Sequence, residues 1–168
     1  MYRRYPRCVD PLFEFGLAVK AIQRELERQA NDAMRPLGLT GAQADALVVI
    51  GQAGPLSLNQ LGQLLIAESG HPSRLVDRLV EAGLVERRTA ADDRRRVELS
   101  LTAAGRRLEK RVAAAREGLL ELAREAVGDR DLTPALELLR ELAGLTSFAD
   151  LLARRRELLE HGRRGGPA

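Results

Sequence analysis

The chain has 168 residues, of which 45% are apolar and only 3% aromatic, and its formal net charge is +3. This length fits one domain, or a small domain with extra helices, and the composition is typical of a folded chain. There is no uncharged apolar run of about eighteen residues and no secretory signal at the start, so we expect a soluble, cytoplasmic protein.

The first predicted element is a helix of about two dozen residues that begins at Asp10-Pro11, with the aspartate as N-cap and the proline at the first helical position. Pro36 and Gly38 end it. Apolar residues recur along this helix at alternating spacings of three and four, which makes a heptad stripe that needs a surface to lie against. The stripe comprises Leu12, Phe15, Val19, Ile22, Leu26 and Ala33.

A capping box of Thr40 and Gln43 predicts a second helix, over residues 41–52. Gly54 and the proline after it end this helix.

A second capping box, of Ser57 and Gln60, predicts a third helix over residues 58–67. A fourth helix is expected over residues 72–82, with Gly83 as its C-cap. Its apolar residues share one face, and they are Leu75, Val76, Leu79 and Val80.

Two short strands follow, "LVERR" at residues 84–88 and "RVELSL" at residues 96–101. In the second strand one face carries Val97, Leu99 and Leu101. The connection between them is "TAADDR". The stretch around it, "RRTAADDRRR" at residues 87–96, has five arginines and two aspartates. A hairpin that served only as a structural turn beside two short helices would not need five arginines.

The rest of the chain is predicted to be helical. Thr102 caps a long helix with heptad spacing of its apolar residues, and "GDRD" breaks that helix. Thr133-Pro134 starts a further helix that carries Leu136, Leu139 and Leu142. "TSFADLLARRRELLEHG" continues this helix or forms one more.

The basic residues are concentrated around the hairpin. Residues 74–111 hold eleven Arg or Lys and seven Asp or Glu, whereas the rest of the chain holds 16 basic and 17 acidic residues. A local positive excess of this kind favours contact with a polyanion. Two helices joined by a tight turn and followed by a hairpin form the plan of a winged helix-turn-helix, whose second helix fits the major groove of DNA.

These residues resemble the MarR family of bacterial transcriptional regulators. The specific pieces are "SRLVDRLVEAGLVERR", the "DDRRR" turn and "VELSLTAAG", and the resemblance covers about residues 12–145. It implies a mainly α fold with a small two- to three-stranded β-wing. It also implies a homodimer on a pseudo-palindromic duplex, which we expect to act as a repressor released by a small organic-acid or phenolic effector.

The resemblance also implies roles for individual residues. Asp93 matches the wing aspartate that braces the hairpin through an ion pair. Arg94 and Arg95 match the wing arginines, one for the minor groove and one for an acid, and which is which stays open. The full expected DNA-binding set is Ser69, His71, Ser73, Arg74, Arg78, Arg94, Arg95 and Arg96, with Arg78 placed for phosphate.

The expected organisation has four parts. An N-terminal dimerisation helix spans residues 10–38, and the DNA-binding lobe spans 39–101, with the recognition helix at about 70–82 and the wing at about 84–101. Residues 102–162 form the long linking helix and C-terminal dimerisation helices, and residues 163–168 a disordered tail. The expected dimerisation residues are Leu12, Phe15, Val19, Ile22, Leu136, Leu139 and Leu142.

Two departures from the family are visible. Pro72 lies in the first turn of the recognition helix, and the segment from about residue 146 to 162 extends beyond the family's usual end.

Other functions find less support in the residues. One cysteine, Cys8, and two scattered histidines offer no metal-ligand cluster, and no nucleotide-binding or hydrolase motif occurs. Asp92 and Asp93 beside three arginines suit ion pairs better than acid–base catalysis. We therefore expect no cofactor and no enzymatic activity, and keep a winged-helix module that binds protein instead of DNA as the alternative.

Overall fold

The computed structural model of the chain describes residues 10–66, 72–89 and 97–164. These residues form helices and one small antiparallel sheet, which confirms the predicted fold class. In chain order the elements are α1 (Pro11–Met34), the 3-10 turn η1 (Arg35–Leu37), α2 (Gly41–Ala53), α3 (Leu58–Gly62), α4 (Pro72–Glu81), β1 (Val85–Thr89), β2 (Val97–Leu101), α5 (Ala103–Val127), α6 (Thr133–Gly144) and α7 (Ala149–Arg164).

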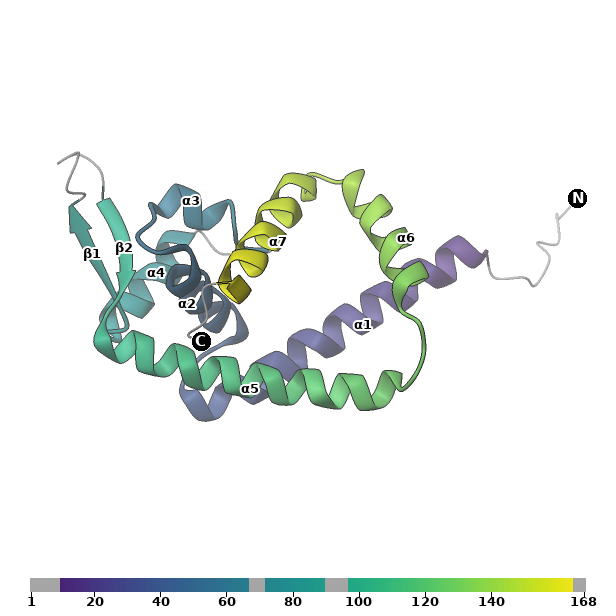
Figure 1. Ribbon diagram of the computed structural model, residues 1–168, viewed down its shortest axis with the longest axis horizontal. Helices are drawn as coiled ribbons and strands as arrows, with labels where there is room; N and C mark the ends of the chain where they lie inside the picture. Colours follow the sequence, from purple (N-terminus) through teal and green to yellow (C-terminus); the bar gives the residue numbers. More distant parts are fainter. Residues whose placement is uncertain (1–9, 67–71, 90–96, 165–168) are drawn as a thin grey trace, which may run out of the picture.

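The winged lobe, made of α2, α3, α4 and the two strands, lies at one end of the molecule (Figure 1). Helices α1 and α5 pack against each other and extend away from this lobe. Beyond α5 the chain turns back through α6, and α7 returns to pack against α2. Helices α1 and α5 thus reach from the lobe to the opposite end of the molecule, and α6 and α7 lead the chain back to the lobe.

Both predicted capping boxes are present in the lobe. The Thr40 hydroxyl accepts from the Gln43 backbone N–H at 3.2 Å, and the Gln43 side chain accepts from the Thr40 N–H at 2.8 Å. Ser57 and Gln60 repeat this arrangement at 3.3 and 2.8 Å. Each box satisfies two backbone donors that the first turn of a helix leaves free, and so fixes where the helix begins.

The core of the lobe is formed by apolar side chains from all of its elements. Leu56 adds a short third piece to the sheet, because its backbone exchanges hydrogen bonds of 3.2 and 2.8 Å with Leu99. The fully buried large side chains are Met34, Leu47, Val49, Ile50, Leu61, Val76, Leu79, Leu99 and Val112. They tie the strands, α4 and the start of α5 into one packed unit.

The third helix is shorter than predicted. We expected it over residues 58–67, but α3 ends at Gly62 and its last turn closes with an i→i+3 bond from Leu64 N–H to the Leu61 carbonyl. A Cβ at Gly62 would lie 3.3 Å from the Pro72 ring at the start of α4. The turn after Gly62 also lets Leu65 reach the core, where it is 7% exposed. Tertiary packing therefore overrides the helical pattern here.

The junction between the wing and α5 is locked by Thr102. Its hydroxyl accepts from the Gly105 N–H at 3.0 Å and donates to the Gly83 carbonyl at 2.7 Å, while its own N–H donates to the Leu84 carbonyl at 3.0 Å. A Cβ at Gly105 would lie 2.0 Å from the Leu84 oxygen. The spacing Leu-Thr-x-x-Gly thus has a direct cause: threonine caps the helix and glycine leaves room for a backbone carbonyl.

The ends of the chain leave apolar surface open. On α1, which Asp10 caps by accepting from the Leu12 N–H at 2.9 Å, the heptad stripe is largely exposed.

The predicted continuation after residue 146 is a separate helix, α7, which runs to Arg164, two residues past the expected boundary at 162. In the described parts of the chain, every helix is too short or too polar to cross a membrane.

Candidate nucleic-acid interface

Helix α4 has one face in the core and one in solvent. Val76 and Leu79 are fully buried, as the predicted apolar face requires. Arg74 and Arg78 are exposed, and their i,i+4 spacing places them on the same side of the helix. The lobe therefore presents two guanidinium groups on the helix that the sequence predicts to be the recognition helix.

No ion pair neutralises these two arginines within the described residues. Like charges at i,i+4 disfavour an isolated helix slightly, and acids on neighbouring turns would relieve that cost. Asp77 of α4 instead pairs with Arg87 of the wing. Arg74 and Arg78 are thus available to an anionic partner.

Of the other predicted base-contact residues, Ser73 is half-buried at the start of α4. Ser69 and His71 lie outside the described residues. Of the four predicted base-contact residues, the structure therefore describes Ser73 and Arg74.

The wing is a regular two-stranded ladder. Val85 pairs with Leu101, Arg87 with Leu99 and Thr89 with Val97. Because side chains alternate along a strand, Val85 and Arg87 lie on the same face, toward the lobe. Leu99 and Leu101 are buried as predicted, whereas Val97 is 50% exposed because the core ends before the last pair.

An ion pair joins the wing to α4. The Arg87 guanidinium lies 2.6 Å from the Asp77 carboxylate, and the two side chains are 42% and 46% exposed. The sequence-based prediction placed wing bracing at Asp93 and did not include this pair. Arg87 and Asp77 lie ten positions apart on different elements, so no spacing in the sequence indicated this pair.

The predicted tip of the wing falls between the two strands. Thr89 and Val97 form the last pair of the ladder, so the connection between them is seven residues long. Asp93, Arg94, Arg95 and Arg96 belong to this connection and lie outside the described residues. Both strands of the wing stem, however, are positioned by the core and by Asp77.

The sequence matches known proteins over this same region. A family model described as "Winged helix DNA-binding domain" matches residues 39–105. The multiple antibiotic resistance protein MarR of Escherichia coli (strain K12) is 31% identical over 96 residues, which cover 57% of this chain and 67% of MarR. The chain belongs to the MarR family of transcriptional regulators. It is therefore a regulator with a winged helix DNA-binding domain.

Two further comparisons extend beyond the lobe. The uncharacterized HTH-type transcriptional regulator YcgE of Bacillus subtilis (strain 168) is 30% identical over 129 residues, covering 76% of this chain and 79% of YcgE. The crystal structure of the MarR family transcription regulator SP03579 has a TM-score of 0.71 at 25% identity, covering 84% of this chain and 93% of that one. The flanking helices thus share the family's arrangement too.

The residues predicted for a MarR-family dimer interface lie on two separate helices of the chain. On α1, Leu12 is 74% and Ile22 60% exposed, and Val19 is 40% exposed, while Phe15 is half-buried. On α6, the three predicted residues are between 39% and 44% exposed, and they are Leu136, Leu139 and Leu142. Leu136 and Leu139 also line a cavity between α6 and α7.

Proposed function

We propose that this regulator is a homodimer that binds a pseudo-palindromic duplex and represses transcription until a small aromatic or phenolic acid releases it. Each α4 enters a major groove with Arg74 toward the bases and Arg78 toward a phosphate. The wing arginines Arg94, Arg95 and Arg96 reach the neighbouring backbone and minor groove, where the negative potential favours arginine.

The observation that carries the DNA-binding part is the exposed face of α4. Arg74 and Arg78 stand on it without an acidic partner in the described chain, and the Asp77–Arg87 pair holds the wing stem beside them. A phosphate backbone supplies the missing negative charge, and arginine binds phosphate through two parallel hydrogen bonds.

The dimer is supported by the apolar stripe of α1. Leucine, valine and isoleucine side chains at heptad spacing are open to solvent along much of its length. Such a contiguous apolar surface is unusual for a helix that works alone and typical of one that packs against a second chain. The family resemblance supports repression and release by an acid.

The test is selection of a randomised duplex pool by the purified protein, followed by affinity for the selected duplex at two salt concentrations. We expect a pseudo-palindrome with half-sites about one helical turn apart. If a dimer neutralises about six to ten phosphates, affinity falls by roughly 10³–10⁵ between 50 and 200 mM salt. A pool without enrichment, or binding that ignores salt, would overturn the proposal in favour of a protein-binding winged helix.

Repression is tested on the selected duplex placed in a promoter. Transcription in a purified system should fall when the protein is added and recover when 4-hydroxybenzoate is added. A rise in transcription on adding the protein alone would contradict the repressor assignment without affecting DNA binding.

A further inference from the structure

Helix α7 packs on the DNA-binding lobe instead of extending into solvent. Its Arg155 guanidinium donates a 2.5 Å hydrogen bond to the Asp45 carboxylate on α2, and both side chains are mostly buried. One position earlier, Arg154 hydrogen-bonds the side chain of Gln63, just after α3. Leu158, about one turn further along α7, packs against the core of the lobe. Three side chains of α7 thus contact the lobe from outside.

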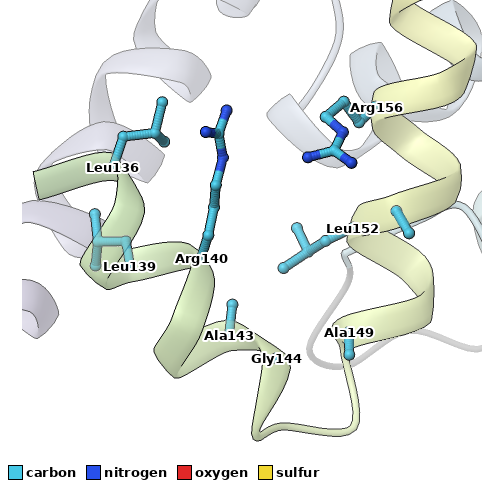
Figure 2. Close-up of a pocket in the computed structure, with 9 residues that line it drawn as sticks. Leu136, Leu139, Arg140, Ala143, Gly144, Ala149, Leu152 and Arg156 are labelled. Carbon is cyan, nitrogen blue, oxygen red and sulfur yellow. The ribbon is translucent and has the colours of Figure 1, made fainter. Parts of the chain in front are cut away.

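A hydrogen-bonded corner joins α7 to α6. The Thr146 N–H and hydroxyl both donate to the Ala143 carbonyl, at 3.0 and 2.8 Å, and the same hydroxyl accepts from the Phe148 N–H at 3.2 Å. Bonds of this kind restrict the backbone of a turn. Figure 2 shows the Arg156 side chain on the side of α7 that faces α6. Movement of α6 is therefore passed on to α7.

The lobe is joined to the rest of the chain by two routes, through α5 and through α6 and α7 (Figure 1). Helix α2 contacts both α5 and α7. Its Asp45 carboxylate pairs with one arginine from each, Arg116 of α5 at 3.3 Å and Arg155 of α7 at 2.5 Å. A lobe attached to α5 alone could tilt, whereas a lobe attached to both helices must break one attachment to do so.

The second route leads to the expected dimer interface. Helix α6 carries three of the residues predicted for that interface, which are Leu136, Leu139 and Leu142. In a dimer, α7 therefore connects each lobe to the region where the two copies meet. The orientation of the lobe relative to the other copy depends on this connection.

We propose that α7 holds the lobe in one orientation, so that the Arg155–Asp45 pair makes the regulator strict about the distance between the two half-sites. When one molecule binds two sites at once, affinity depends on how well its geometry matches their separation. A lobe held by two helices fits one separation, whereas a lobe held by α5 alone adapts to several. Arg155 and Asp45 are thus positioning residues that act through the lobe. This inference rests on the proposed dimeric binding of DNA.

The test measures the affinity of the full chain for the selected duplex and for the same duplex with one base pair inserted between the half-sites. The insertion moves one half-site by about 3.4 Å and turns it by about 35°. The spacing ratio is the first affinity divided by the second. Arg155→Gln frees α7 but leaves Asp45 paired with Arg116, and should lower this ratio about tenfold, as the loss of a hydrogen bond between charged groups predicts.

Arg116→Gln is the matched control. It removes the other arginine from the same carboxylate, but α5 stays attached to the lobe because Val112 is buried in the core. Its spacing ratio should equal that of the unmodified protein. A variant that is merely less stable loses affinity for both duplexes in the same proportion, so the ratio reports the orientation of the lobe and not its stability.

A double variant checks that Arg155 acts through Asp45. Adding Asp45→Asn to Arg155→Gln should leave the lowered ratio as it is, because the pair is already broken. A further fall in the ratio would show that the two residues act separately and would overturn the assignment.

The remaining outcomes separate this inference from the proposed function. An unchanged ratio in Arg155→Gln, or an equal fall in Arg116→Gln, overturns the inference and leaves dimeric DNA binding intact. If the unmodified protein binds no duplex, or binds a single half-site as tightly as the pair, the proposed function and the inference both fail.

Discussion

Arg155 of α7 donates a 2.5 Å hydrogen bond to the carboxylate of Asp45 on α2, although the two residues are 110 positions apart in the chain. The same carboxylate lies 3.3 Å from Arg116 of α5. Asp45 and Arg155 are mostly buried, with side chains 26% and 17% exposed. One carboxylate therefore joins the lobe to both the outgoing helix and the returning helix.

Removing that charge should loosen the attachment of α7. Asp45→Asn leaves two arginines without their acid, one of them largely buried, and we expect the free energy of unfolding to fall by about 1–3 kcal/mol. Urea denaturation monitored by circular dichroism measures this. As a control, Glu117→Gln removes an acid from the exposed pair with Arg124, and should change stability by less than about 1 kcal/mol. Equal losses in both variants would refute the special role of Asp45.

Gly105 and Gly118 make a second matched pair on α5. Gly105→Ala forces a Cβ to within 2.0 Å of the Leu84 carbonyl oxygen, so the wing or α5 must shift. We expect a loss of about 1–3 kcal/mol or more, as for overpacked cores. Gly118→Ala meets nothing within 4 Å and should be neutral or stabilising by up to about 1 kcal/mol, since alanine favours helix. Midpoints of urea unfolding decide between these outcomes, and a stable Gly105→Ala protein would contradict the close approach.

Arg78→Ala should weaken binding to every duplex alike. The guanidinium is exposed on α4, and an interaction with phosphate carries no sequence information. We expect the slope of log affinity against log salt to fall by about one for each phosphate that is no longer neutralised. Arg124→Ala, which changes an arginine in the last turn of α5, should leave both quantities unchanged. A loss confined to particular sequences would instead place Arg78 against the bases.

For the wing, we predict that either Arg94→Ala or Arg95→Ala costs about 1–3 kcal/mol per half-site and flattens the preference for flanking A·T pairs. The variant of the arginine that pairs with acid should lose less. Competition between duplexes with A·T and G·C flanks reports this directly. If both variants keep the original affinity and salt slope, the wing does not contact the minor groove.

Glu109 gives a pH dependence whose sign is fixed by its position. Burial raises the pKa of the Glu109 carboxyl above its ordinary 4.5, against a smaller lowering effect of Lys110. The folded protein therefore binds the proton more tightly than the unfolded chain, and the Glu109 contribution to stability falls as pH rises from below 4.5 through the raised pKa. Glu109→Gln should remove that fall, so its stability relative to the unmodified protein improves from pH 4 to pH 7. A constant difference between the two proteins across this range would contradict it.

The features of this fold that could be predicted from the sequence are those that depend on residues close together in the chain. Thr40, Ser57 and Thr102 cap their helices as predicted, because a cap depends on residues three positions apart. The buried face of α4 followed equally from spacing. The length of α3 did not, because it depends on how the turn after Gly62 packs against α4 and brings Leu65 into the core.

The ion pairs that organise the molecule could not be predicted in the same way. Asp77–Arg87 and Asp45–Arg155 join residues on different elements, and any of the many arginines of this chain would have served as well on sequence grounds. The cavity of α6 and α7 depends likewise on how α7 folds back, which no spacing reveals. The sequence therefore predicts exposed charged residues, but only the tertiary arrangement shows which acid each arginine pairs with.

The bond network of Thr102 and the tight fit at Gly105 leave no hinge between the wing and α5. With 25 residues, α5 is a rod of about 37 Å that ends at the wing. A tilt of about 5° at its far end sweeps the wing sideways by about 3 Å, close to the spacing of about 3.4 Å between successive base pairs. Small angular adjustments among the distant helices would therefore displace the wing by about the spacing of one base pair.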